Sequence, residues 1–152
     1  METVHDILAG KGDEVYSVGP DATLYEALEL MAERNVGAVL VIDASGAVQG
    51  IFSERDFVRK ILIKGRSVEG TRVREIMTSH VLYVEPKTSI AECMTLMTEK
   101  RIRHLPVVSN GKPVGVVSIG DVVKALLQQQ EKVITQQAFE IGQLERYITK
   151  SP

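Results

Sequence analysis

Two kinds of hydrophobic spacing alternate along this chain. Apolar residues between 24 and 31 recur at helical spacing behind Thr23 and Glu26, a pair that predicts a capping box at a helix start. The apolar runs that follow this helix are short enough for buried strands. The elements expected in the first half are a short helix at 3–9, a strand at 15–18, a helix from Thr23 to near Asn35, a strand at 36–42, a hairpin loop at 43–46, a strand at 48–52 and a helix starting at Ser53. After the first short helix, their order is β-α-β-β-α.

The second half repeats this order. Pro86, Ser89 and Met97 stand 66 positions after Pro20, Thr23 and Met31, so Ser89 and Glu92 predict an equivalent capping box. The offset drops to 65 after the second hairpin, where Asn110-Gly111 predicts a tight two-residue turn in place of a longer loop. Beyond that turn, a glycine, two apolar residues, a serine and an aspartate recur as Gly50, Ile51, Phe52, Ser53 and Asp56 and again as Gly115, Val116, Val117, Ser118 and Asp121.

We therefore predict an α/β fold made of tandem β-α-β-β-α repeats. The first repeat spans 1–65, a linker with few apolar residues spans 66–72, and the second repeat spans 73–128. A helical extension, 129–152, continues a helix that is expected to start near Ile119. Along it, Leu127, Ile134, Ile141 and Ile148 fall every seven residues, with Leu144 beside them, which indicates a partial coiled-coil seam. This predicts a homodimer, although the helix could instead pack on its own domain.

The composition bounds the classes of function. A net charge of −2 gives no reason to expect a nucleic acid partner, and the longest apolar run is too short to span a bilayer. The start of the chain lacks the pattern of a signal peptide, and the single cysteine, Cys93, suits a reducing compartment. We therefore expect a cytoplasmic protein with no membrane partner.

Several patterns that would indicate catalysis fail when their chemistry is considered. The glycines at 65 and 70 are not followed by the lysine and hydroxyl of a phosphate-binding loop, and the three histidines lie too far apart in sequence for a zinc site. Cys93 falls on a helical apolar stripe, which favours a buried small hydrophobe over a nucleophile. We therefore expect no enzymatic activity.

The repeated serine and aspartate allow two interpretations. Serine at the start of a helix and aspartate three residues later form a cap that stabilises the helix. The same geometry suits a nucleotide, because a helix start favours phosphate and a carboxylate can accept both hydroxyls of a ribose. The stretch 101–106 favours the nucleotide, since Arg101, Arg103 and His104, followed by Pro106, put cationic donors at a strand start just before the hairpin returns to Ser118. Solvated surface charge is the alternative for these cations.

At this point the chain resembles the cystathionine β-synthase (CBS) domain family, with a tandem pair over roughly residues 1–128. The resemblance rests on GIFSERD at 50–56, GVVSIGD at 115–121 and RIRHLPVV at 101–108. It implies two repeats packed about a pseudo-twofold axis, with two clefts that bind AMP, ATP or NAD in many relatives. It also implies a regulatory module that signals to a partner protein. A scaffold with vestigial pockets, acting through its C-terminal helix, is the alternative.

The resemblance also assigns roles to individual residues. The roles are ribose binding for Asp56 and Asp121, phosphate or ribose binding for Ser53 and Ser118, phosphate binding for Arg103 and His104, and an adenine slot for Ile51 and Val116. The first repeat departs from the pattern, because Val36 and Gly37 stand where the second has Ile102 and Arg103. Arg55 is the residue expected to supply its missing charge. The two clefts are therefore not expected to be equivalent.

Overall fold

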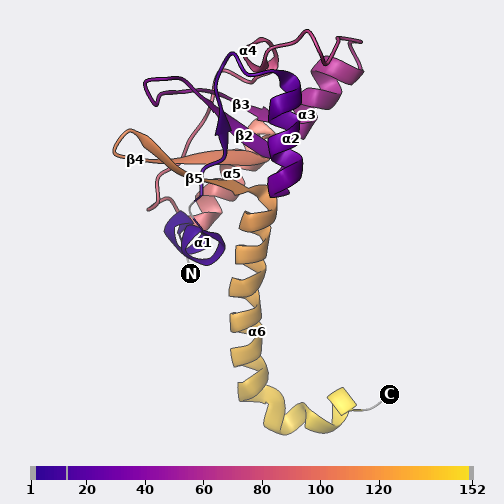
Figure 1. Ribbon diagram of the computed structural model, residues 1–152. Coiled ribbons are helices and arrows are strands. Elements are labelled where there is room, and N and C mark those ends of the chain that lie inside the picture. The colour runs from indigo at the N-terminus through magenta and orange to yellow at the C-terminus, as the bar shows by residue number, and fades with distance from the viewer. Residues whose placement is uncertain (1–2, 13, 151–152) are drawn as a thin grey trace.

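The computed structural model describes residues 3–12 and 14–150, and in the last helix it describes side chains as far as Ile134 and that of Gln137. The tandem α/β fold with a long C-terminal helix is confirmed (Figure 1). Its elements are α1 (Val4–Lys11), β1 (Ser17–Val18), α2 (Leu24–Arg34), β2 (Ala38–Ile42), β3 (Val48–Ser53), α3 (Glu54–Asp56), the π-helix η1 (Phe57–Leu62), α4 (Val73–Ile76), α5 (Ile90–Lys100), β4 (His104–Ser109), β5 (Lys112–Ser118) and α6 (Ile119–Lys150).

The equivalent helices α2 and α5 begin and end in the same way. The Thr23 hydroxyl accepts the Glu26 N–H at 3.1 Å, and the Ser89 hydroxyl accepts the Glu92 N–H at 3.0 Å. Each helix ends at a residue with φ of 54°, Asn35 after α2 and Arg101 after α5. The left-handed residue stops the helix and turns the chain into the next strand. The helix starts predicted at Thr23 and Ser89 are thus confirmed, and each shows the hydroxyl half of the predicted capping box.

Each repeat contributes an antiparallel hairpin. β2 pairs with β3, and β1 adds to β2 in parallel, whereas β4 pairs with β5. In the second hairpin Asn110 has φ of 52° and Gly111 has φ of 76°. Positive φ at both central residues is what a tight hairpin turn of this kind requires, so the turn predicted from Asn-Gly is confirmed.

Two hydrophobic cores are present, and each combines the strands and long helices of one repeat with the short helix of the other repeat. One core contains Leu24, Val39 and Phe52, together with Val73 and Ile76 of α4. The other contains Ile90, Leu105 and Val117, together with Val4, Ile7 and Leu8 of α1. The repeats at 1–65 and 73–128 describe the duplicated pattern along the chain, whereas the short helix at the start of each repeat packs on the core of the other.

The stretch 66–72, expected as a linker, is anchored to the first core. The Thr71 side chain is buried and its hydroxyl donates to the Ser67 carbonyl at 2.6 Å. The Thr71 carbonyl accepts the Leu24 N–H at 3.0 Å, and Thr23 and Arg72 form a β-bridge. This stretch therefore fixes α4 beside the start of α2.

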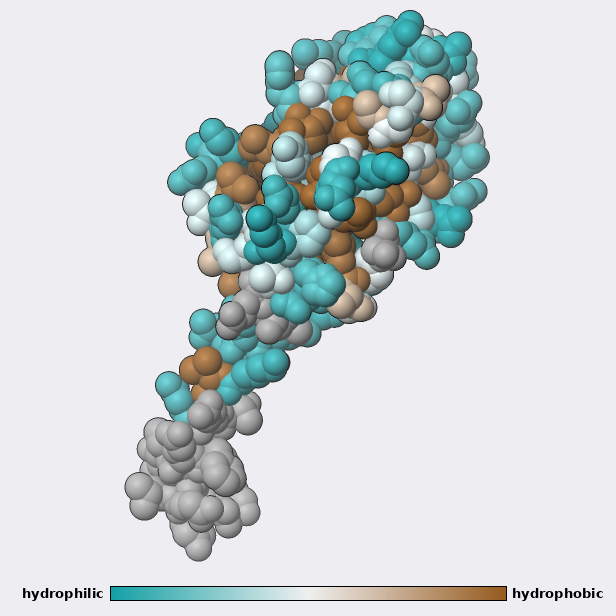
Figure 2. All heavy atoms as spheres, turned by 90° about the vertical axis from the view of Figure 1, so that its left-hand side faces the viewer, coloured by the Kyte–Doolittle hydropathy of each residue, from teal (hydrophilic) through white to brown (hydrophobic). Residues whose placement is uncertain are grey.

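The C-terminal helix α6 leaves the folded body after its first turns. Val122 and Ala125 are buried in the second core, but Leu127 and Ile134 are 58% and 59% exposed. Figure 1 shows the rest of α6 running out from the body, and Figure 2 shows an apolar group interrupting the hydrophilic surface of that portion. The alternative of α6 packing fully on its own domain is therefore wrong for the described side chains. Ile141, Leu144 and Ile148 of the predicted seam lie outside the described side chains.

The helix predicted at Ser53 differs in form from the expected one. Only α3 is α-helical, and η1 continues it with wider turns, in which the Ile63 N–H donates to the Val58 carbonyl at 3.0 Å. Within η1, Lys60 donates to the Ile76 carbonyl at 2.9 Å and lies 3.2 Å from an Asp56 oxygen. Lys60 of the π-helix thereby connects the end of α3 to the end of α4.

Candidate nucleotide clefts

Both repeated serine–aspartate pairs form reciprocal caps. The Ser53 N–H donates to Asp56 Oδ2 at 3.0 Å, and the Asp56 N–H donates to the Ser53 hydroxyl at 3.3 Å. At the start of α6, the Ser118 N–H donates to Asp121 Oδ2 at 2.8 Å and the Asp121 N–H donates to the Ser118 hydroxyl at 3.1 Å. The capping interpretation is thus confirmed, and it leaves a carboxylate and a hydroxyl at each helix start.

Each cleft combines the helix start of one repeat with a segment from the other repeat. The first cleft is a cavity of about 130 Å³ lined by Ile51, Ser53, Arg55, Asp56, Arg59, Thr78, Arg101, Ile102, Arg103 and His104. The second cleft is a cavity of about 460 Å³ lined by Lys11, Gly12, Glu14, Tyr16, Asn35, Val36, Gly37, Ala38, His104, Val116, Ser118 and Asp121. The 36–38 segment of the first repeat thus faces the second helix start, and the 101–104 segment faces the first.

This crossing corrects the grouping expected from the sequence. The chain order put Arg103 next to Ser118, but the Arg103 side chain lines the first cleft with Ser53 and Asp56. His104 lines both clefts. Pro106 is buried in β4, where its carbonyl accepts the Val84 N–H at 2.9 Å. Proximity within one hairpin failed as a guide because the two repeats pack with the strand start of one against the helix start of the other.

The first cleft is rich in cations, and its aspartate is enclosed. Arg55, Arg59, Arg101 and Arg103 all line it. Asp56 is 8% exposed and its Oδ1 accepts from the Thr78 hydroxyl and contacts Lys60 Nζ, both at 3.2 Å. Since Oδ2 already bonds to Ser53, both carboxylate oxygens have partners in the structure.

The aspartate of the second cleft is more accessible and has a different partner. The Asp121 side chain is 23% exposed, and its Oδ2 lies 2.7 Å from Lys11 Nζ. Burial raises the pKa of the Asp121 carboxyl, but the hydrogen bonds from Lys11 and Ser118 outweigh burial and bring the pKa below its usual value. Asp121 is therefore a carboxylate at neutral pH.

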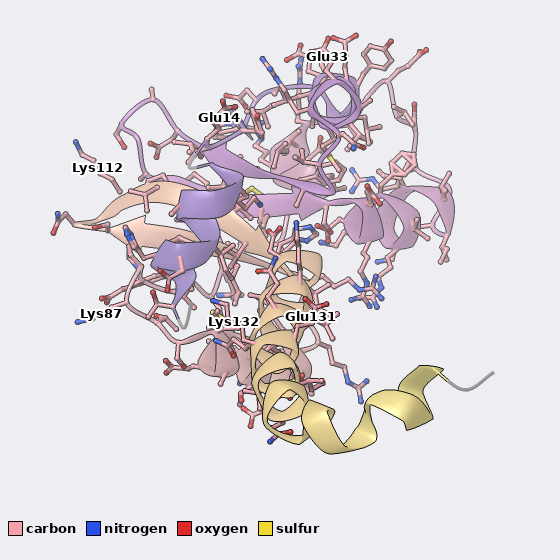
Figure 3. All side chains as sticks on the ribbon, turned by 90° about the horizontal axis from the view of Figure 1, so that it is seen from below. Glu14, Glu33, Lys87, Lys112, Glu131 and Lys132 are labelled. Carbon is pink, nitrogen blue, oxygen red and sulfur yellow. The ribbon has the colours of Figure 1, made fainter. Side chains whose placement is uncertain are left out.

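An aromatic ring lines the opposite side of the second cleft. Tyr16 is half-buried, its hydroxyl bonds to the Glu14 carboxylate, and the Arg34 guanidinium lies 5.4 Å from the centre of the ring. In Figure 3, Glu14 projects from the segment that leads from α1 to β1. The second cleft thus offers both apolar and acidic surface.

His104 lies between the two clefts. Burial is the largest effect on its imidazole and lowers its pKa, and the positive charges of Lys11 and Arg103 lower it further, against the opposing charge of Asp121. A Cβ atom built on Gly37 would come within 3.3 Å of His104 Nε2. The glycine therefore leaves room for a neutral imidazole that both clefts share.

Cys93 has the environment expected of a structural residue. The side chain is buried in the second core, and burial, followed by the charge of Glu92, raises the pKa of its thiol to about 11. The interpretation as a small buried hydrophobe is confirmed.

In the described part of the chain, no helix combines the length and apolarity needed to span a bilayer.

The sequence interpretation missed Lys11, Tyr16 and Thr78. Lys11 ends α1, and Tyr16 and Thr78 lie in the segments that follow α1 and α4, two helices that were not recognised as repeated. A signal was present, because Val4-x-Asp6-Ile7 in α1 corresponds to Val73-x-Glu75-Ile76 in α4. Recognising that second repeat would have indicated that the residues after both helices approach a cleft.

The chain is similar to known proteins over most of its length. The family model described as the CBS domain matches residues 4–63 and 73–128. The CBS domain-containing protein CBSX3 of Arabidopsis thaliana, named as mitochondrial, is 38% identical over 138 residues, which cover 86% of this chain and 67% of that protein.

Two solved structures extend the similarity to the fold. A protein with CBS domains from Burkholderia ambifaria MC40-6, provisionally described as a signal-transduction protein, is 49% identical with a TM-score of 0.80, covering 84% of this chain and 96% of that one. CBSX2, solved in complex with AMP, is 28% identical with a TM-score of 0.69, covering 84% and 98%. With the family model matching both halves, this chain belongs to the CBS domain family as a tandem pair.

Proposed function

We propose that this protein is a regulatory module that binds an adenine nucleotide, of the AMP, ATP or NAD type, and signals its bound state to a partner protein. The observation that carries the proposal is the Ser118–Asp121 helix start, which opens onto a cavity of about 460 Å³. Cavities of about 300–1,000 Å³ are typical of small-molecule sites. The AMP complex of the related CBSX2 supports the ligand class.

The side chains of the second cleft suit the parts of a nucleotide. The Asp121 carboxylate can accept two ribose hydroxyls, and the Ser118 hydroxyl with the first N–H groups of α6 can hold a phosphate. Val116 and Tyr16 supply apolar surface for the adenine ring. This cleft is the principal site of the proposal.

The first cleft is proposed as a smaller, more cationic second site. Ser53 and Asp56 stand at its helix start and Ile51 beside them, while Arg55, Arg103 and His104 supply positive or hydrogen-bonding groups for a phosphate. Its cavity of about 130 Å³ is below the usual range for a small-molecule site, so binding there requires side chains to move. Occupancy is therefore expected first in the second cleft.

Calorimetric titration of AMP, ATP and NAD tests the proposal, with Asp121→Ala as the diagnostic variant. If Asp121 holds the ribose, affinity falls by about 1.5–3 kcal/mol, or roughly tenfold to a hundredfold, and the ligand-induced rise in melting temperature shrinks. If Asp121 only caps α6, stability falls by about 0.5–2 kcal/mol while affinity is unchanged. Wild-type protein that binds none of the three ligands would favour the scaffold alternative.

A role in regulation fits the known relatives and the chemistry of the chain. Its single cysteine is buried with a raised pKa, so it is not suited to nucleophilic catalysis. Exposed apolar residues on α6, Leu127 and Ile134 among them, support the proposal that two copies associate through this helix. A cytoplasmic location stays a prediction, and the Arabidopsis relative is named as mitochondrial.

A further inference from the structure

Lys11, the last residue of α1, places a positive charge in the lining of the second cleft. Its Nζ donates to Asp121 Oδ2 at 2.7 Å and to the Val116 carbonyl at 3.0 Å. In the first cleft the equivalent acceptors are Asp56 and the Ile51 carbonyl. Thr78 donates to both, through its hydroxyl at 3.2 Å and its N–H at 2.8 Å, and Lys60 of η1 also contacts Asp56. A lysine ammonium thus stands where the first cleft has a neutral residue held by its backbone.

The difference follows from the lengths of two equivalent helices. α1 and α4 pack at matching places, because a Cβ on Gly115 would come within 2.7 Å of Leu8 and one on Gly50 within 2.7 Å of Met77. However, α1 has eight residues and α4 has four. The additional turn of α1 carries Lys11 to the helix start of α6, whereas the chain after α4 pairs with β3 instead.

The Lys11–Asp121 ion pair also separates two cavities. Both residues line the second cleft and a neighbouring cavity of about 320 Å³, which α1 and α6 enclose together with Lys124 and Gln128. The Lys11 side chain is 40% exposed. Ion pairs with this much exposure are weak, so a ligand that offers competing hydrogen bonds can displace the lysine without unfolding α1.

We propose that Lys11 selects phosphorylated ligands over unphosphorylated adenosine in the second cleft. This inference depends on the proposed function of that cleft. When ribose hydroxyls bond to Asp121, Lys11 loses its anionic partner, and only a ligand that carries a phosphate supplies another. A nucleoside leaves the ammonium with the Val116 carbonyl as its acceptor, whereas a phosphate gives it a charged partner, so the phosphorylated ligand is favoured. In the first cleft the uncharged Thr78 takes the equivalent place, and the lysine that contacts Asp56 is Lys60 of η1, which also donates to the Ile76 carbonyl.

Titrations of AMP and adenosine, followed by the backbone amide signals of Ser118 and Asp121, test this selection. Wild-type protein is expected to bind AMP at least about tenfold more tightly than adenosine at these signals. Lys11→Met should bring the two affinities close together, by weakening AMP and leaving adenosine equal or tighter. Lys11→Arg, which keeps the charge, should keep the preference. Lys112→Met is the matched control, since Lys112 points outward from the second hairpin (Figure 3) and should behave as wild type.

The outcomes separate this inference from the function on which it depends. If wild-type protein shows AMP binding at Ser118 and Asp121 but Lys11→Met keeps the same ratio of affinities, Lys11 has no selective role and the inference fails alone. Equal weakening of AMP and adenosine in Lys11→Met also overturns it, because that pattern indicates general damage to the cleft. If AMP leaves the Ser118 and Asp121 signals of wild-type protein unchanged, the proposed function of the cleft fails and takes the inference with it.

Discussion

The two clefts begin from the same repeated motif and end with different chemistry. Each has a serine–aspartate cap at a helix start, yet the first is small, carries four arginines and encloses Asp56, whereas the second is larger and holds Asp121 through Lys11. The caps are alike because they stabilise the start of a helix in both repeats. The surroundings differ because they come from segments outside the repeated motif. Duplication therefore preserved a structural device while the neighbouring chain set charge and access.

The largest expected difference between the clefts is in stability. Asp56→Ala should lower the free energy of unfolding by about 2–4 kcal/mol, because Lys60 and Thr78 lose a buried partner. Asp121→Ala should lower it by only about 0.5–2 kcal/mol, since that carboxylate is more exposed. Urea unfolding of both variants measures the two losses. Asp21→Ala, which breaks an exposed pair with Arg74, is the control and should cost about 1 kcal/mol or less. Equal losses for Asp56 and Asp121 would remove the distinction between an enclosed and an open aspartate.

Arg103→Ala tests the crossing of the two repeats. Because its side chain lines the first cleft, the variant should weaken phosphate-bearing ligands there by about 1.5–3 kcal/mol more than adenosine, with amide shifts confined to Ser53 and Asp56. Arg74→Ala, which alters an arginine paired with Asp21, is the control. Changes centred on Ser118 instead would return Arg103 to the cleft that its position in the sequence suggests.

The pH dependence of stability tests the residue that both clefts share. The pKa of His104 is lowered in the folded protein relative to the value of about 6.5 in the unfolded chain. Below about pH 6.5 the unfolded chain therefore binds more protons at His104 than the folded chain does. The free energy of unfolding should therefore fall as the pH drops through 6.5, by at most about 1.4 kcal/mol for each unit by which folding lowers the pKa of His104. His104→Asn should flatten this slope in urea titrations at pH 7.5 and 5.5. An unchanged slope would assign the pH dependence to other groups.

Removal of the C-terminal helix should have the smallest effect on the clefts. A chain ending at Gln129 keeps the buried residues Val122 and Ala125 but loses the exposed Ile134. Dimer stability, measured by light scattering, is expected to fall, because the apolar seam is removed. AMP affinity at both helix starts should stay within about twofold, since residues 130–152 line neither cleft in the described part of the chain. A large loss of affinity would show that the clefts depend on assembly.

The sequence by itself determined the repeated elements. Local rules were sufficient for the helix starts at Thr23 and Ser89, the Asn110-Gly111 turn and the caps at Ser53 and Ser118, because each depends on residues only a few positions apart. The family resemblance was also present in the sequence, since its motifs are continuous stretches. The length of the C-terminal helix followed from the spacing of its apolar residues.

Only the tertiary structure decided which side chains share a cleft. Arg103 directly precedes β4, whose first residue, His104, pairs with Ser118, yet Arg103 and Ser118 line different cavities. Lys11 reaches Asp121 across 110 positions of chain. Such contacts depend on how two cores pack against each other and on which core each short helix joins. The capping and turn patterns do not encode that arrangement, because it depends on burying Val4, Ile7 and Leu8 in the core of the other repeat.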